Sequence, residues 1–216
     1  MSQAMRCILI APAILALGGC GTPRPINYYG IQIPASPTPA SHKYPVDLAV
    51  GRITGSDLLE AAPIVYRTRR NQIGTYQYHR WEEAPVQLVQ AKLIRLLRAS
   101  GEYQSVSGLG GQPNGELVIR GRLYDFAEVD GDAITGLVTV EFELYNRRTA
   151  KILWSHFYSQ TEPVEAKQMP AVVQALDRNL DRGLKEVVTA LGRYFEANPP
   201  VRSTEASGQA INEAKK

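Results

Sequence analysis

The sequence is poor in the residues that cross-link small domains or bind metals. It contains only two cysteines, Cys7 and Cys20, and both lie within the first twenty positions. If the segment up to Gly19 is removed, Cys20 alone remains. A single cysteine can form neither an internal disulfide nor a two-cysteine metal or redox site. The chain has 216 residues, which is long enough to bury a core without such cross-links.

Patterns typical of catalysis and of cofactor binding are also missing. The three histidines, His42, His79 and His156, are not joined by metal-ligand spacing, so we expect no metal site. No Gly-x-Ser-x-Gly elbow occurs, and the glycines at 108, 110 and 111 lack phosphate-binding spacing. The sequence therefore indicates no enzyme and no cofactor. The net charge of +3 comes without a long basic stretch, so we expect no nucleic-acid partner.

The N-terminus has the pattern of a secretory signal. Arg6 is the only charged residue before position 24, and an apolar run at residues 7–17 follows it. The run is interrupted by Pro12 and is shorter than the roughly 20 apolar residues that span a bilayer. We therefore predict a cleaved signal peptide at residues 1–19.

Leu17-Gly18-Gly19-Cys20 resembles the bacterial lipobox. That resemblance implies diacylglycerol on the Cys20 thiol, cleavage before it, and acylation of the new amino group. The alternative is a cleavable signal with an incidental cysteine. Gly21, in place of aspartate, resembles the sorting signal of outer-membrane lipoproteins, so we expect a lipid-anchored protein in the outer membrane, facing the periplasm. Several acyl chains hold such a protein stably, at about 0.8 kcal/mol per buried CH₂.

The mature chain divides into three parts by composition. Residues 20–43 hold the lipidated cysteine and a proline-rich tether, expected to be a semi-rigid spacer that keeps the domain off the bilayer. Within it, residues 28–31 are apolar enough to pack on the domain. Residues 44–197 form a single domain. Residues 198–216 are polar and small, and we expect a disordered tail.

Alternation and periodicity predict the elements of this domain. Helical spacing predicts one helix from about Glu82 to Ser100, stopped by Gly101, and another from about Met169 to Ala197. Residues 107–115 read as a glycine-rich loop. Period-two patterns predict strands near residues 46–50, 64–69, 73–78, 117–129, 134–145 and 151–159. The short turns between the last three predict an antiparallel meander. We expect an α/β (α+β) fold, with a mixed or antiparallel sheet packed by two main helices, the last one covering its apolar face.

This layout resembles the auxiliary lipoproteins of MCE-type ABC transport systems, the paraquat-inducible PqiC type. Besides the lipobox, the resemblance rests on Ile64-Val65-Tyr66-Arg67, on His79–Pro85 leading into the first helix, and on Leu153–Phe157 followed by Glu162-Pro163. It covers roughly residues 44–196. The chain departs from the family in the Glu-Glu-Ala-Pro before that helix and in its polar tail.

The resemblance implies a non-enzymatic accessory subunit that helps move phospholipid or other hydrophobic molecules across the periplasm and supports outer-membrane integrity. The implied partners are an MCE-domain protein and the membrane; homo-oligomerisation stays open. A lipoprotein assembly factor or chaperone for an outer-membrane or secretion complex is the alternative function. A periplasmic hydrolase is disfavoured, because no nucleophile–base pair is evident.

Candidate partner-binding residues are arginines and aromatics near the second and third strands. Trp81 is either a partner anchor or lipid contact, or a residue that packs the helix entry onto the sheet. Arg67, Arg69 and Arg70 either meet acidic lipid headgroups or an acidic partner, or line a solvated face. The contact surface is expected on the sheet face left open by the last helix, or around Arg67, Tyr76 and Tyr78. By parity Trp154 and Phe157 point to opposite faces, so at least one is expected in the core.

Overall fold

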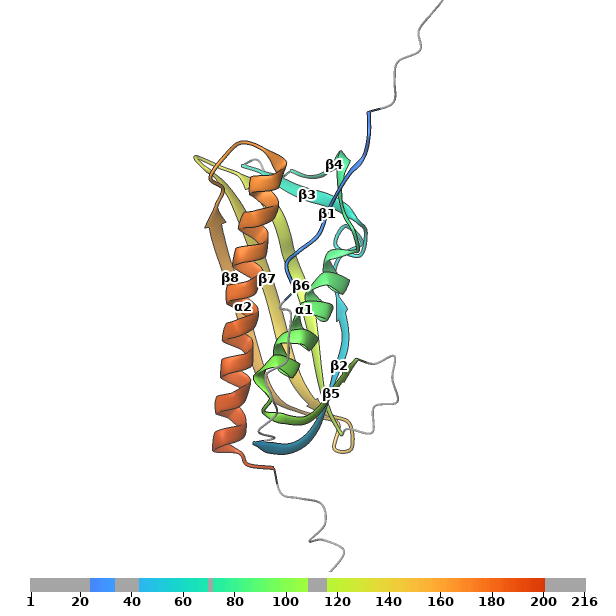
Figure 1. Ribbon diagram of the computed structural model, residues 1–216, viewed down its shortest axis with the longest axis vertical. Helices are drawn as coiled ribbons and strands as arrows, with labels where there is room; N and C mark the ends of the chain where they lie inside the picture. Colours follow the sequence, from blue (N-terminus) through green and yellow to red (C-terminus); the bar gives the residue numbers. More distant parts are fainter. Residues whose placement is uncertain (1–23, 34–42, 70–71, 109–115, 201–216) are drawn as a thin grey trace, which may run out of the picture.

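Eight strands and two helices make up the part of the chain that the computed structural model describes, residues 24–33, 43–69, 72–108 and 116–200 (Figure 1). The predicted signal peptide, Cys20 and the tail beyond residue 200 lie outside these ranges. The elements in chain order are β1 (Asn27–Tyr29), β2 (Tyr44–Thr54), β3 (Pro63–Thr68), β4 (Ile73–Trp81), α1 (Pro85–Ser100), β5 (Tyr103–Gly108), β6 (Leu117–Asp130), β7 (Ile134–Asn146), β8 (Lys151–Pro163) and α2 (Met169–Ala197).

The long strand β6 organises the sheet. On one edge it pairs antiparallel with β7, which pairs antiparallel with β8. On its other edge β6 pairs in parallel first with β2 and then, nearer its end, with β3. The sheet therefore forks into a β2–β5 branch and a β3–β4–β1 branch (Figure 1). The mixed sheet and the β6–β7–β8 meander confirm the predicted fold class.

Helix α1 begins at Pro85, three residues later than Glu82, the predicted start. The residue before a proline avoids the helical region, and Ala84 is accordingly extended, with φ −61° and ψ 142°. The Gln87 side-chain oxygen accepts a hydrogen bond from the Ala84 N–H at 3.3 Å, which satisfies one free donor of the helix start. The helix ends as predicted, because Gly101 takes the left-handed conformation with φ 65°.

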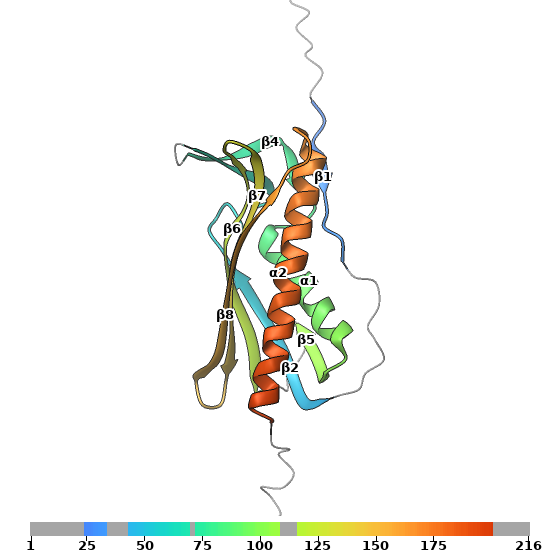
Figure 2. The same cartoon turned by 90° about the vertical axis from the view of Figure 1, so that its left-hand side faces the viewer.

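Both helices lie on the same face of the sheet (Figure 2). The inward residues of β7 and the apolar stripe of α2 are fully buried against each other: Val138, Val140, Phe142, Leu144, Leu176, Leu180, Leu184, Val187 and Leu191. Each such side chain contributes about 1.5–3 kcal/mol by leaving water. This confirms the prediction that the last helix covers the apolar face.

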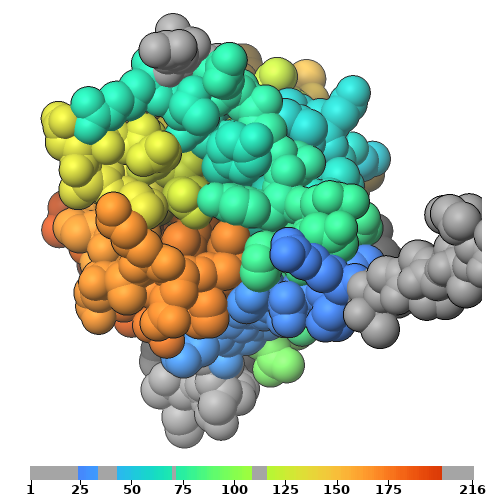
Figure 3. Space-filling view, turned by 90° about the horizontal axis from the view of Figure 1, so that it is seen from above, coloured from blue at the N-terminus to red at the C-terminus, as the bar shows by residue number. Residues whose placement is uncertain are grey.

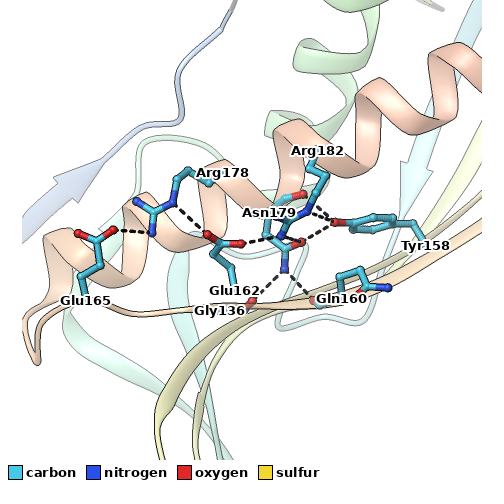
Figure 4. Close-up of polar contacts among 8 residues, drawn as sticks. All are labelled: Gly136, Tyr158, Gln160, Glu162, Glu165, Arg178, Asn179 and Arg182. Atoms are coloured by element: carbon cyan, nitrogen blue, oxygen red, sulfur yellow. Dashed lines mark hydrogen bonds and ion pairs between the residues drawn. The ribbon is translucent and has the colours of Figure 1, made fainter.

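Two glycines let α2 approach the sheet closely. A Cβ at Gly136 would lie 3.1 Å from Leu176, and one at Gly183 would lie 2.6 Å from the Tyr158 ring. The close approach places buried Asn179 of α2 over the β7–β8 pair (Figure 4). Packing without side chains at these two positions is therefore part of what fixes the helix on the sheet.

The segment at residues 24–33 belongs to the domain. Strand β1 pairs in parallel with β4, and Ile31 is buried in the core. The Glu82 N–H donates to the Tyr29 carbonyl at 2.8 Å, and the Gln32 N–H donates to Asp177 Oδ2 of α2 at 3.1 Å. Figure 3 shows this segment against the first turns of α2 and against β4. The spacer predicted for residues 20–43 therefore does not extend through residues 24–33.

Candidate functional site

The face of the sheet opposite the helices carries a charged and aromatic surface, here called the open face. Alternation along β6 and β7 sends one set of side chains into the core and the other outward. The register sets Arg120 opposite Glu143 and Arg122 opposite Glu141. We define the open face by the outward residues Arg120, Arg122, Tyr124, Glu141, Glu143, Tyr145 and Phe157. In the described residues no helix covers this face (Figure 2).

Hydrogen bonds and ring contacts hold the charges of the open face in place. Arg120 Nε donates to Glu143 Oε2 at 2.7 Å, and its guanidinium lies 4.5 Å from the centroid of the Tyr145 ring. The Tyr124 hydroxyl donates to Glu141 Oε2 at 2.9 Å, and this hydrogen bond raises the pKa of the Tyr124 phenol. Both carboxylates are thus already engaged by a neighbour.

Arg122 is the charge on this face that lacks a carboxylate partner. Its guanidinium lies 5.5 Å from the Tyr124 ring centroid, and within the described residues it makes no ion pair or hydrogen bond. It lines a groove of about 260 Å³ together with Arg52, Thr54, Arg120, Gly121, Glu141 and Glu143. Three arginines there face two glutamates, so the groove has an excess of positive charge. A planar guanidinium with free donors is suited to bind a carboxylate or a phosphate.

An apolar flank adjoins this groove. Phe157 of β8 is 59% exposed, and its ring lies 6.4 Å from that of Tyr124. Ile152 and Leu153 are also exposed on β8, whose outer edge is unpaired in the described part of the sheet. Trp154 is partly buried against the core, so it and Phe157 separate as their parity predicted. Positive charge beside exposed aromatic and aliphatic groups is the composition of a binding surface.

The predicted residue Arg67 lies on the same face, beyond Tyr124. Its Nη2 lies 2.5 Å from Asp125 Oδ1 in an ion pair. The side chain also borders a hollow of about 30 Å³ near Leu58 and Ile73. That volume is enough for about one water molecule. Arg69 is exposed and pairs with Asp132. Arg67 and Arg69 thus have carboxylate partners within the chain, unlike Arg122; Arg70 lies outside the described residues.

The structure places Tyr76 on the opposite side of the sheet from Arg67. Its hydroxyl donates to Glu128 Oε2 at 3.0 Å, and its ring packs on Tyr66 and His79. Burial raises the pKa of Tyr76 and that of the Glu128 carboxyl. The predicted cluster of Arg67, Tyr76 and Tyr78 is therefore not one surface.

Of the two remaining predicted residues, Tyr78 is partly exposed and Trp81 is buried in the core. Tyr78 is partly exposed, with the Arg24 guanidinium 6.0 Å from its ring centroid. Trp81 is 0% exposed, with its ring 5.1 Å from that of Phe126. The interpretation of Trp81 as a partner anchor is wrong, because β4 turns the indole into the core; the packing alternative holds. Cys20 lies outside the described residues.

Sequence reasoning missed the groove residues Arg52, Arg120, Arg122 and Tyr124. A signal was present, since Arg-x-Arg-x-Tyr in one strand and Glu-x-Glu-x-Tyr in the next alternate out of phase with the apolar residues. Only the pairing register of β6 with β7 shows that these two sets of side chains lie opposite each other on one face.

The two described histidines do not share a site. The Tyr29 hydroxyl and His79 Nδ1 lie 2.9 Å apart, whereas His156 Nε2 lies 2.9 Å from Glu186 Oε1 and its ring stacks on Trp154. In the ranges that the structure describes, no group of three His, Cys, Asp or Glu side chains is placed to hold a metal ion. Neither described helix is both long and apolar enough to cross a membrane.

Solved structures of other proteins have a similar architecture. A crystal structure of a protein from Xanthomonas campestris, of the DUF330 family, is similar with a TM-score of 0.72 and 14% identity, over 80% of this chain and 98% of that one. Another crystal structure, of an uncharacterised protein, matches with a TM-score of 0.62 and 12% identity, over 78% of this chain and 99% of that one. These likenesses show a shared fold. The curated protein sequences gave no match.

A family profile gives the assignment. The profile described as "ABC-type transport auxiliary lipoprotein component" matches residues 29–188. The match runs from Tyr29, the last residue of β1, to Val188 in α2, so it includes α1, strands β2 to β8 and most of α2, and it agrees with the resemblance found in the sequence. The chain belongs to the family of ABC-type transport auxiliary lipoprotein components.

Proposed function

We propose that this protein is a non-enzymatic lipoprotein subunit of an MCE-type ABC transport system. Lipid on Cys20 would hold it in the outer membrane, facing the periplasm, where it would support the movement of phospholipid or other hydrophobic molecules and the integrity of that membrane. The observation that carries the proposal is the family match across residues 29–188, which describes an auxiliary component of a transporter.

The open face is the surface we assign to the partner, an MCE-domain protein. Its groove offers the unpaired guanidinium of Arg122 to an acidic group, and Tyr124 and Phe157 offer rings to apolar ones. The opposite face of the sheet is already covered by α1 and α2 (Figure 2). Binding of this kind gains specificity and association rate from charge complementarity, and affinity from the buried rings.

The test is recovery of the MCE-domain protein with the affinity-tagged lipoprotein from solubilised membranes. We expect the wild type to retain it, and Arg122→Glu to lose most of it, with the loss greatest at low ionic strength. Arg122 makes no ion pair within the described residues, so its reversal breaks no salt bridge of the fold. Arg193→Glu is the matched control, because Arg193 is exposed on α2 and lies off the open face.

Two results would count against the proposal. If the folded wild type retains no MCE-domain protein but retains components of another outer-membrane complex, the assembly-factor function replaces it. If Arg122→Glu and Arg193→Glu retain the MCE-domain protein equally at every ionic strength, the partner binds elsewhere than on the open face.

A further inference from the structure

We propose that the domain rests directly on the bilayer that holds its lipid anchor, through the end that carries residues 24–28 and Tyr78. We call this end the anchor-proximal end. The inference rests on the lipidation of Cys20 proposed above. It replaces the picture of a domain suspended on a long spacer, and it names the lipid interface as the occupant of this surface.

The first step is chain length. Four residue steps separate Cys20 from Arg24. Consecutive residues of an extended chain advance by at most about 3.6 Å, so the acylated sulfur lies within about 14 Å of the Arg24 backbone, plus the reach of one side chain. A lipidated Cys20 therefore brings Arg24 to the headgroup region of the membrane.

The second step is that Arg24 is followed at once by chain fixed to the domain. The guanidinium of Arg24 lies over the Tyr78 ring, and β1 begins three residues later. The following residues, 27–32, are held by the parallel pairing of β1 with β4, by the burial of Ile31 and by the hydrogen bond from the Gln32 N–H to Asp177. There is no room between the lipid and this contact for a spacer to lift the domain away.

The third step is what the segment presents outward. Ile26 is 43% exposed and Tyr28 is 64% exposed, and both lie within eight positions of Cys20. Ile26 directly precedes β1 and Tyr28 lies within it, whereas the neighbouring Tyr29 is partly buried against the core. An aliphatic group, a tyrosine and an arginine side by side are typical of the membrane–water interface, where the rings and aliphatic stems enter the lipid and the polar ends stay wet.

The arrangement also sets the orientation of the open face. The chain enters the fold at one end of the long axis, and the β7–β8 turn before Lys151 lies at the other end (Figure 1). With the anchor-proximal end on the bilayer, β6, β7 and β8 run away from it. The open face then stands upright in the periplasm, free to meet a partner that approaches from the opposite membrane.

Single-cysteine variants of the lipidated mature chain provide the test, because the acylated Cys20 leaves no other free thiol after signal cleavage. Tyr28→Cys and the matched control Lys151→Cys are each labelled with acrylodan. Each protein is then reconstituted into vesicles of phosphatidylethanolamine and phosphatidylglycerol. Flotation of the vesicles first reports whether the chain is anchored.

We expect the probe at position 28 to emit at shorter wavelength in the vesicles, to be quenched by lipids carrying a nitroxide near the headgroup, and to be shielded from iodide. The probe at position 151 should emit as in water and be quenched by iodide. Anchored protein whose two probes behave alike would overturn the inference while leaving the anchor intact. Protein that fails to float at all would overturn the anchor and this inference together.

Discussion

At the scale of single residues, Asn179 shows how one polar side chain fixes a helix on a sheet. Its Nδ2 donates to the carbonyls of Gly136 at 2.9 Å and Gln160 at 2.7 Å, and its Oδ1 accepts from the Tyr158 hydroxyl at 2.6 Å (Figure 4). The side chain is completely buried, so bulk water cannot take the place of these hydrogen bonds.

We expect Asn179→Ala to lower the free energy of unfolding by about 3 kcal/mol, because the carbonyls of Gly136 and Gln160 lose a buried donor and the Tyr158 hydroxyl loses its shortest hydrogen bond. For a domain of this size that is a fall in Tm of roughly 10 °C. Thermal unfolding followed by circular dichroism measures it. Asn198→Ala, which removes an exposed bond at the end of α2, is the control and should change Tm little. Equal Tm values for both variants would show that the Asn179 bonds contribute nothing net.

Glu128 predicts a pH dependence of stability. Desolvation raises the pKa of its carboxyl, so above its ordinary value of 4.5 the folded state binds more protons than the unfolded state. The free energy of unfolding therefore decreases as the pH rises from about 4.5 through the raised pKa of Glu128 in the folded state. Glu128→Gln keeps an acceptor for the Tyr76 hydroxyl and removes the charge. We expect its Tm to match the wild type near pH 4 and to exceed it near pH 7.5.

Exposed Glu116 gives the control for this pH effect. It pairs with Arg148 on the surface, where an ion pair is worth little, so Glu116→Gln should follow the wild-type profile. A Glu128→Gln variant that loses stability at pH 7.5 would show that the Glu128 carboxylate is better solvated than its burial indicates.

Residue-scale reasoning from the sequence was limited by contacts between distant positions. Arginine is a residue type common in interfaces, yet the charge of Arg67 is engaged by Asp125, which lies nearly sixty positions away. Arg122 gave no sign of being unpaired, because that depends on how β6, β7 and β2 lie together. Trp81 looked the same in sequence whether it faced a partner or the core.

At the scale of elements, a buried lysine joins the two helices and the N-terminal segment. Lys92 of α1 is 1% exposed, and its Nζ lies 2.7 Å from Asp177 and 3.5 Å from Asp181, both on α2. The other oxygen of Asp177 accepts from the Gln32 N–H. One carboxylate thus connects α1, α2 and the chain that follows β1.

Loss of this lysine should loosen all three elements. We expect Lys92→Ala to lower the free energy of unfolding by about 3–5 kcal/mol, because it leaves an unpaired carboxylate and a cavity between the helices. Lys185→Ala removes the exposed partner of Asp181 and should cost less than about 0.5 kcal/mol. Urea unfolding of the two variants compares them. Lys92→Met, which refills the volume, should recover part of the loss; equal effects of Lys92→Ala and Lys185→Ala would contradict the inference.

Elements with long, regular patterns were predictable, and short ones were not. Both helices and the strands from β2 to β4 and β6 to β8 follow their hydrophobic period, and the two-to-four-residue turns fixed the meander. Strand β1 has three residues in a proline-rich stretch, and β5 is half polar before a glycine-rich segment, so neither carries a period. Their parallel pairings with β4 and β2 arise from chain crossovers, which no local signal encodes.

At the scale of the whole molecule, the two faces of the sheet and the two ends of the long axis differ in what they expose. One face of the sheet is covered by helices and forms the core; the other face is open and carries charge and rings (Figure 2). Strand β1 lies at one end of the long axis, and the β7–β8 turn lies at the other (Figure 1). The proposed docking function requires a fixed orientation of the domain more than it requires a pocket, and the proposed contact of the anchor-proximal end with the bilayer would supply that orientation.

The proposed non-enzymatic function makes a prediction about the histidines. Imidazole is the commonest acid–base group in enzymes, and a hydrolase that used a histidine of the described domain would use His79 or His156. His79 lies on β4 and His156 on β8, and their partners are the Tyr29 hydroxyl and the exposed carboxylate of Glu186 on α2. Among the described residues, no serine, threonine or cysteine side chain is hydrogen-bonded to either ring. We therefore expect the double variant His79→Ala/His156→Ala, once shown to fold and to reach the membrane, to restore detergent resistance to a deletion strain as well as the wild type does. Arg122→Glu should fail to restore it. If the histidine variant fails and the arginine variant succeeds, the activity lies in acid–base chemistry rather than in docking on the open face.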